Sequence, residues 1–258
     1  ETLYCHSNQL TSLDVSQNTA LTDLDCGGHP FTILDISQNT ALETLWCTDN
    51  QLTSLDVSQN TALENLNCGD NQLTILDISQ NTALTYLNCN INQLTSLDVS
   101  QNTALTFLQC QDNHLTSLDV SQNTALTDLD CQGNQLTSLD LSQNVNLLGI
   151  QCYDNQLTCL NVANGNNLDI TLTADNNPDL TCIEVDNYIW ATANWQGQVH
   201  PEASFSQDCN NDCSSSTVGI NELSTSKNLI QILDLMGRET SFKPNTPLIY
   251  VCDDGSIE

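Results

Sequence analysis

Apolar and polar positions repeat every 21 residues over residues 1–163. The unit reads L-T-S-L-D-V-S-Q-N-T-A-L-T-x-L-x-C-x-x-N-Q. Successive units start at Leu10, Phe31, Leu52, Leu73, Leu94, Leu115, Leu136 and Leu157. Each half of the unit carries one L-x-x-L-x-h-x-x-N pattern, which is long enough for one short strand and one turn. The pattern predicts a mainly β solenoid with short strands on both flanks and little or no helix.

Alternation within each predicted strand separates inward from outward side chains, because neighbouring residues in a strand point to opposite faces. On one flank, which we name the cysteine flank, Leu45 and Cys47 are expected to point inward and Trp46 outward. On the other, the aspartate flank, Leu55 is expected to point inward and Asp56 outward. Both flanks therefore contribute to one aliphatic core.

One inward column consists of cysteines spaced 21 residues apart, namely Cys5, Cys26, Cys47, Cys68, Cys89, Cys110, Cys131 and Cys152. A thiol in apolar surroundings stays protonated and packs as a small hydrophobe. Stacked coils hold neighbouring Cβ atoms about 4.8 Å apart, beyond the usual disulfide range of ~3.5–4.5 Å. We expect core packing here rather than a redox or metal site.

Two asparagine columns mark the predicted turns. The first is Asn8, Asn50, Asn71, Asn92, Asn113, Asn134 and Asn155, and the second is Asn18, Asn39, Asn60, Asn81, Asn102, Asn123 and Asn144. Their amides can bond backbone groups that a tight turn leaves without strand partners, so both columns are interpreted as structural. His29 interrupts the first column, where we expect a local variant of the turn rather than a ligand site.

The segment L-E-T-L-W-C-T-D-N-Q-L, from Leu42 to Leu52, resembles the leucine-rich-repeat family signature. The resemblance covers roughly residues 1–163 and implies that the strand surface is the binding face. Residues 164–209 resemble the C-terminal cap of bacterial leucine-rich-repeat proteins of the Bacteroidetes type. That resemblance implies a Cys182–Cys209 disulfide, while Cys159 either pairs with Cys213 or stays free.

Residues 210–226 form a polar linker, and residues 227–258 alternate in strand fashion around D-L-M-G-R. This last segment resembles the C-terminal sorting domain of the type IX (Por) secretion system, in a truncated form. The resemblance implies the secretion machinery as a partner. It also implies a protein that is secreted or held on the outer cell surface of a Bacteroidetes-type bacterium.

The net charge of -29 limits the classes of partner. The only lysines and arginines are Lys227, Arg238 and Lys243, so residues 1–226 hold 27 acidic side chains and no Lys or Arg. Such a surface repels nucleic acid and attracts basic partners and divalent cations. No stretch is apolar enough for membrane insertion.

The variable outward positions of the cysteine flank form the candidate ligand-binding face. Aromatic and amide side chains there can stack on and hydrogen-bond to a protein or glycan ligand, although strand propensity alone also favours aromatics. The candidate residues are Tyr4, Trp46, Asn67, Tyr86, Asn88, Phe107, Gln109, Asp130 and Tyr153.

The aspartate flank is nearly invariant and carries the weaker candidate site, a Ca²⁺ site at Asp56, Asp77, Asp98 and Asp119. Carboxylates in neighbouring coils repel one another unless bound Ca²⁺ or hydrogen bonds from hydroxyls or amides compensate. Hydrogen bonds are the favoured explanation, so no cofactor is assigned.

No nucleophile motif or phosphate loop is present, and an enzyme is not expected. The sequence therefore predicts a secreted or cell-surface binding or adhesion module. The alternative is a cohesive structural protein that assembles through its solenoid edges or through Ca²⁺ on the aspartate flank.

Overall fold

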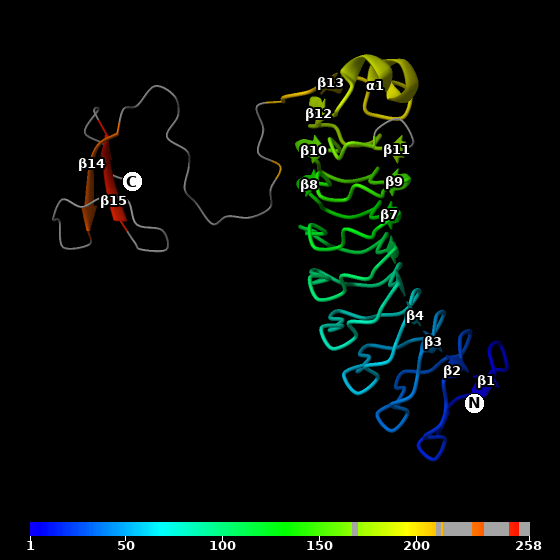
Figure 1. The fold of residues 1–258 in the computed structure, drawn as a ribbon. Helices are drawn as coiled ribbons and strands as arrows, with labels where there is room; N and C mark the ends of the chain where they lie inside the picture. Colours follow the sequence, from blue (N-terminus) through cyan, green and yellow to red (C-terminus); the bar gives the residue numbers. More distant parts are fainter. Residues whose placement is uncertain (167–169, 210–212, 214–228, 235–247, 253–258) are drawn as a thin grey trace. The chain divides into compact units, whose positions relative to one another are not determined.

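The computed structural model describes residues 1–166, 170–209, 213, 229–234 and 248–252. The chain divides into two compact units, Glu1–Ser215 and Ser216–Glu258. The first is a solenoid of stacked coils that ends in a short helix (Figure 1). The mainly β solenoid predicted from the repeat is confirmed. Among the residues described, no helix is long and apolar enough to cross a membrane.

The cysteine flank forms a parallel sheet of nine strands, in the order β1-β2-β3-β4-β5-β6-β7-β9-β11. Each strand pairs with its neighbour one unit away, so that Leu45 lies beside Leu66 and Trp46 beside Asn67. The strands are β1 Thr2–Tyr4, β2 Asp23–Asp25, β3 Thr44–Trp46, β4 Asn65–Asn67, β5 Tyr86–Asn88, β6 Phe107–Gln109, β7 Asp128–Asp130, β9 Gly149–Gln151 and β11 Thr171–Thr173.

The aspartate flank forms a shorter sheet next to the cap. Its strands are β8 Ser138–Asp140, β10 Cys159–Asn161, β12 Cys182–Glu184 and β13 Ser204–Ser206. Residues 1–137 of this flank hold no strand, so the expectation of strands on both flanks is met only in the C-terminal coils. Without a ladder the coils of this flank can spread, and the ribbon curves there but runs straighter where both sheets are present (Figure 1).

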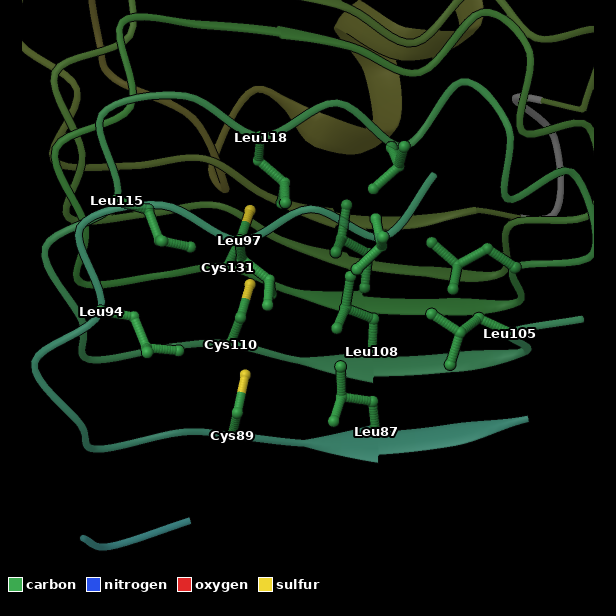
Figure 2. Close-up of a cluster of buried hydrophobic side chains, with 14 of the residues drawn as sticks. Leu87, Cys89, Leu94, Leu97, Leu105, Leu108, Cys110, Leu115, Leu118 and Cys131 are labelled. Carbon is green, nitrogen blue, oxygen red and sulfur yellow. The ribbon is translucent and has the colours of Figure 1, made fainter. Parts of the chain in front are cut away.

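Leucine, valine, isoleucine and cysteine fill the interior between the two flanks. Figure 2 shows how each coil repeats the packing of the one before, with Cys89, Cys110 and Cys131 in one row and Leu87 beside Leu108. These side chains are at most 8% exposed where the coils stack, whereas Leu3 and Cys5 of the N-terminal coil are only partly buried. Burying one leucine contributes roughly 1.5–3 kcal/mol, so each coil depends on its neighbours for stability.

The first asparagine column forms hydrogen bonds with the backbone groups of the turns on the cysteine flank. Asn71 accepts from the Leu52 N–H at 2.9 Å and donates to the carbonyls of Cys47, Cys68 and Gly69. His29 takes the same role two coils earlier. Its Nδ1 accepts from the Leu10 N–H at 3.2 Å and its Nε2 lies 2.9 Å from the Cys5 carbonyl oxygen. The structural interpretation of His29 therefore holds.

The second asparagine column closes the turns of the aspartate flank differently. Asn81 donates to the carbonyls of Val57 and Asn60 at 3.1 and 2.8 Å. Its buried Oδ1 has no partner within the described chain, and the same holds for Asn39, Asn60, Asn102, Asn123 and Asn144. This column thus forms a ladder of amide donors from coil to coil.

The C-terminal end of the solenoid is covered by helix α1, Tyr188–Trp195, which the sequence analysis did not foresee. Asn187 caps the helix by accepting from the Trp190 N–H at 3.1 Å. Trp195 is 2% exposed and packs against Trp190 and Phe205. The helix supplies the apolar cover that a solenoid end requires.

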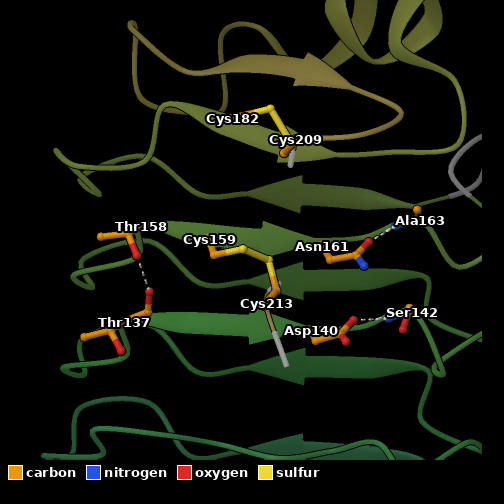
Figure 3. Close-up of a disulfide and its surroundings, with 10 residues drawn as sticks. All are labelled: Thr137, Asp140, Ser142, Thr158, Cys159, Asn161, Ala163, Cys182, Cys209 and Cys213. Carbon is orange, nitrogen blue, oxygen red and sulfur yellow. Dashed lines mark hydrogen bonds between the residues drawn. A yellow bond between two sulfur atoms is a disulfide. The ribbon is translucent and has the colours of Figure 1, made fainter. Parts of the chain in front are cut away.

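Two disulfides attach the end of this unit to the aspartate flank (Figure 3). The bond expected between Cys182 and Cys209 is present. Cys159 pairs with Cys213, which decides between the two alternatives left open by the sequence.

The second unit contains an antiparallel pair, β14 Leu229–Asp234 and β15 Leu248–Cys252. The strands expected from the alternation on either side of D-L-M-G-R are therefore formed. The D-L-M-G-R segment itself lies outside the described residues after Asp234.

Candidate functional site

The outward side chains of the cysteine-flank sheet form one continuous face. The central residue of each strand points the other way: Leu45, Leu66 and Leu87 are fully buried. The predicted alternation of inward and outward side chains is therefore correct. Tyr4 and Trp46 are exposed, Asp130 is buried, and the other candidates are half-buried: Asn67, Tyr86, Asn88, Phe107, Gln109 and Tyr153.

Two aromatic groups stand out on this face. Tyr86 and Phe107 occupy the same position of neighbouring coils, and their rings stack with centroids 4.9 Å apart and planes at 5°. Nearer the N-terminus, Tyr4 and Trp46 line a groove of about 420 Å³ together with Asp23 and Asp25. Four of the five candidate aromatics therefore lie in two separate places, and Tyr153 is the fifth.

Beside the aromatic stack the backbone takes a left-handed turn at the same position of each coil. Residues with positive φ there are Ser7, Gly28, Asp49, Asp70, Ile91, Asp112, Gly133, Asp154 and Asn176. Ile91, with φ 47°, is the β-branched member, and such residues rarely adopt this conformation. Its side chain is 46% exposed in the coil of Tyr86. The sequence analysis missed Ile91, although aspartate, asparagine or glycine at most equivalent positions signalled the turn.

Asp130 is the most perturbed carboxylate of the face. It is 8% exposed, and the Gln132 N–H donates to its Oδ1 at 3.3 Å. Burial, together with the nearby Asp112 carboxylate, raises the pKa of Asp130 to about 6. This side chain was expected to lie open on the surface, and its burial is a property that alternation alone does not predict.

On the aspartate flank each candidate carboxylate caps its own turn. The Ser58 N–H donates to Asp56 at 2.9 Å, and the equivalent bonds hold Asp77, Asp98 and Asp119 at 2.9–3.0 Å. Hydrogen bonds from the serines lower the pKa of Asp56, Asp77 and Asp98. These contacts are the compensation favoured by the sequence analysis. Over the described residues, no three His, Cys, Asp or Glu side chains gather in a metal-binding arrangement.

Comparison with known proteins finds one matching repeat family and several solved structures with a similar fold. The model of the LVIVD repeat family matches residues 68–91, and no curated protein matches the chain. The functional domain of InlJ from Listeria monocytogenes, which includes a cysteine ladder, is 31% identical with a TM-score of 0.53. That alignment covers 79% of this chain and 57% of the InlJ chain, so the chain spans little more than half of this relative.

The chain is a leucine-rich-repeat solenoid protein. Internalin C2 from Listeria monocytogenes shares its fold at 20% identity, with a TM-score of 0.61 and coverage of 71% of this chain and 80% of the internalin. The leucine-rich-repeat ectodomain of the Arabidopsis thaliana receptor kinase GASSHO1/SCHENGEN3, solved in complex with CASPARIAN STRIP INTEGRITY FACTOR 2, is 22% identical with a TM-score of 0.53. The alignment covers 58% of this chain and 20% of the receptor-kinase chain.

In this leucine-rich-repeat protein the cysteine column is a ladder of free thiols. Burial raises the pKa of the Cys26 and Cys68 thiols to about 12, so they stay protonated at neutral pH. Protonated, enclosed thiols are poor nucleophiles and poor metal ligands. The ladder is therefore part of the core, as expected from its spacing.

Proposed function

We propose that this protein is a non-enzymatic binding module, secreted or exposed on a cell surface, that recognises a protein ligand through the outward face of its cysteine flank. Leucine-rich-repeat domains such as the internalins typically mediate protein binding. The two disulfides fit an oxidising, extracellular environment. A glycan is the second ligand class that exposed aromatics and amides could bind.

The observation that carries this proposal is the stacked Tyr86–Phe107 pair, which stands on the variable face and not in the core. A stacked aromatic pair offers a rigid apolar anchor at low entropic cost, as is common at the centre of protein interfaces. Ile91, in its strained turn, adds a further exposed apolar side chain in the same coil. Strain of this kind is often retained at functional sites.

The test uses protein and glycan arrays probed with the labelled full chain. A ligand that binds the wild type should bind Tyr86→Ala and Phe107→Ala more weakly, by roughly 1–3 kcal/mol for each lost anchor. Thermal unfolding should change little, since both side chains lie outside the leucine core.

The matched controls are Ile33→Ala and Ile75→Ala, which remove exposed apolar side chains, 80% and 75% accessible, from the aspartate flank. These variants should bind like the wild type. If they lose the ligand while the aromatic variants keep it, the working face has been assigned to the wrong flank.

A second candidate function rests on the aspartate flank, where Ile75, Asp77, Ser79, Ser96 and Asp98 line a groove of about 360 Å³. Oxygen ligands from neighbouring coils are the type that Ca²⁺ prefers. Here the protein would be a cohesive surface component that assembles through Ca²⁺ or through its solenoid edges. Calcium-dependent sedimentation that is abolished in Asp77→Asn with Asp98→Asn would favour this function.

We further propose that residues 227–258 direct export through the type IX secretion machinery. The antiparallel β14–β15 pair on either side of D-L-M-G-R is the supporting observation. Expression in a Bacteroidetes host with and without a working type IX system provides the test. Secretion that persists without that system, or without residues 227–258, contradicts this role.

A further inference from the structure

The groove of about 420 Å³ on the cysteine flank lies over β2, between two aromatic side chains. Tyr4 ends β1 and Trp46 ends β3, and both pair in register with Asp25, which ends β2. Both aromatic side chains are exposed, and their Cα atoms stand two strand spacings apart, roughly 9–10 Å. The shorter side chains of Asp23 and Asp25 line the groove between these two walls.

The D-L-D triplet of β2 recurs in β7, and the two copies show what the aromatic walls add. In each copy the hydroxyl of the preceding threonine donates to the first aspartate, at 2.6 Å in β2 and 2.7 Å in β7. The N–H two residues farther on donates to the second aspartate at 3.3 Å in both. In β7 the second aspartate, Asp130, lies between two glutamines and is buried. In β2 it is Asp25, which lies between Tyr4 and Trp46 and lines the groove. The aromatic neighbours therefore distinguish this place from an acidic pair alone.

The two carboxylates in the groove differ in how many of their oxygens are already bonded. His6 Nδ1 lies 2.8 Å from Asp25 Oδ2, and the Gly27 N–H donates to Asp25 Oδ1. On Asp23, the hydrogen bonds within the described chain fall on Oδ2 and come from threonine hydroxyls at 2.6 and 3.4 Å. Asp23 Oδ1 is neither bonded in this way nor closed to solvent. One carboxylate oxygen of the groove is thus left for a ligand.

The charge and the walls of the groove favour the same kind of ligand. Asp23 and Asp25 are two residues apart on one face of β2, with Cα atoms about 6–7 Å apart, so a positive charge between them is stabilised. No lysine or arginine among residues 1–226 competes for that place. The faces of tyrosine and tryptophan rings also attract cations. A cationic group with an apolar stem therefore complements the groove.

We infer that the groove over β2 binds a lysine side chain of the protein ligand between Tyr4 and Trp46, with its ammonium at Asp23. This inference rests on the proposed function of the cysteine flank and names the ligand chemistry that the flank selects. The four-carbon stem of lysine packs along the aromatic walls, and its compact ammonium needs only one carboxylate oxygen. A guanidinium fits less well, because its planar fork pairs best with both oxygens of one carboxylate.

The test measures the dissociation constant of the full chain for acetyl-Gly-Lys-Gly-amide, for its Nε-acetyl-lysine counterpart and for the corresponding arginine peptide. At physiological salt the wild type should prefer the lysine peptide over the acetylated one by at least about tenfold and over the arginine peptide by about twofold or more. Asp23→Asn and Trp46→Ala should each weaken lysine-peptide binding roughly five- to tenfold.

Two matched variants separate this site from the general negative field and from a folding defect. Asp128→Asn removes the corresponding charge from β7 and should change the dissociation constant by less than about twofold. Trp46→Phe keeps an aromatic face and should bind within about threefold of the wild type. Equal losses in Asp23→Asn and Asp128→Asn overturn the inference, as do unchanged binding in Trp46→Ala and a preference for the arginine peptide.

The array ligands distinguish failure of this site from failure of the proposed function. If Tyr86→Ala weakens an array protein while Trp46→Ala and Asp23→Asn do not, the binding face stands and the lysine site is rejected. If the lysine peptide behaves as expected but no array ligand depends on Tyr86, the lysine site stands and the aromatic stack is not the anchor. A neutral glycan that is lost in Trp46→Ala and kept in Asp23→Asn would make the groove a glycan site and overturn the inference.

Discussion

The two flanks of the solenoid hold their coils together by different means. On the cysteine flank, main-chain hydrogen bonds join nine strands into one ladder, while outward side chains differ from coil to coil. Before Ser138 the aspartate flank has no strand, and its sequence is nearly constant. There, the side-chain amide of Asn81 joins the coils by donating to the carbonyls of Val57 and Asn60, while Asp77 holds the turn of its own coil by accepting from the Ser79 N–H.

The difference explains where the sequence is free to vary. A backbone ladder tolerates most outward side chains, because its bonds involve only peptide groups. A turn held by an aspartate and an asparagine needs a side-chain acceptor and a side-chain amide at fixed positions, so few residue types fit there. Variation is therefore compatible with stability on one flank only, which makes that flank the suitable place for a recognition surface.

The largest expected effect comes from the asparagines that close the two flanks. Asn71→Ala should lower the free energy of unfolding by about 3 kcal/mol, because it leaves the buried Leu52 N–H without an acceptor and removes three donated bonds. Asn81→Ala should cost only about 1 kcal/mol, since the Oδ1 that is lost has no partner. Chemical denaturation measures both. Equal losses of unfolding free energy in the two variants would show that the two columns contribute alike. Gln72→Ala, at an exposed position, serves as the neutral control.

A smaller effect is expected from Asp130→Asn, and it should depend on pH. The folded-state pKa of about 6 lies above the ordinary value of 3.8, so the folded protein holds this proton more tightly than the unfolded chain. Stability therefore falls as pH rises from about 4 to 6, and the penalty is complete above 6. Asn at this position should stabilise the protein by about 1–2 kcal/mol at neutral pH and by almost nothing near pH 4.

The titration of Asp130 also depends on the groups that surround it. The Gln132 N–H and Asp112 lie beside it, Gln109 and Gln151 flank it in the sheet, and Tyr153, whose own pKa it helps to raise, comes from the next coil. Of these, Asp112 is the only other carboxylate near enough to alter the profile. Asp112→Asn should therefore move the transition to lower pH. An unchanged profile in both variants would mean that Asp130 is solvated.

The repeat predicted most features that depend on one coil, although strands formed on the aspartate flank only from Ser138 onward. The inward leucines and cysteines, both asparagine columns and the β strands of the tail follow from local patterns. The Cys182–Cys209 bond came from the resemblance to bacterial caps. Properties that depend on how neighbouring coils pack were missed: the burial of Asp130, the curvature that opens the aspartate flank, and the helix over the last coil. Alternation assigns a face but not the depth of a side chain on it.

Ile91 offers a test of whether the cysteine flank stores strain. Ile91→Asn places a residue that tolerates positive φ where the backbone has φ 47°. It should raise the free energy of unfolding by about 1 kcal/mol, the usual order for a left-handed residue. Asp70→Asn, at the equivalent turn of the preceding coil, should change little. If Ile91→Asn instead destabilises the protein, the isoleucine side chain contributes packing that outweighs its backbone conformation.

The smallest effect is expected from the aspartate flank itself. Asp77 is exposed, and its lowered pKa means that its bond to Ser79 adds stability at neutral pH that is lost only in acid, as the carboxylate takes up a proton. Asp77→Asn keeps an acceptor for the Ser79 N–H and removes repulsion from its neighbours, so the unfolding midpoint should hardly move. Millimolar Ca²⁺ should leave the midpoints of the wild type and the variant the same. A calcium-dependent rise in the wild type alone would show that the constancy of this flank serves ion binding as well as turn formation, and the aspartate flank would then become a second functional surface.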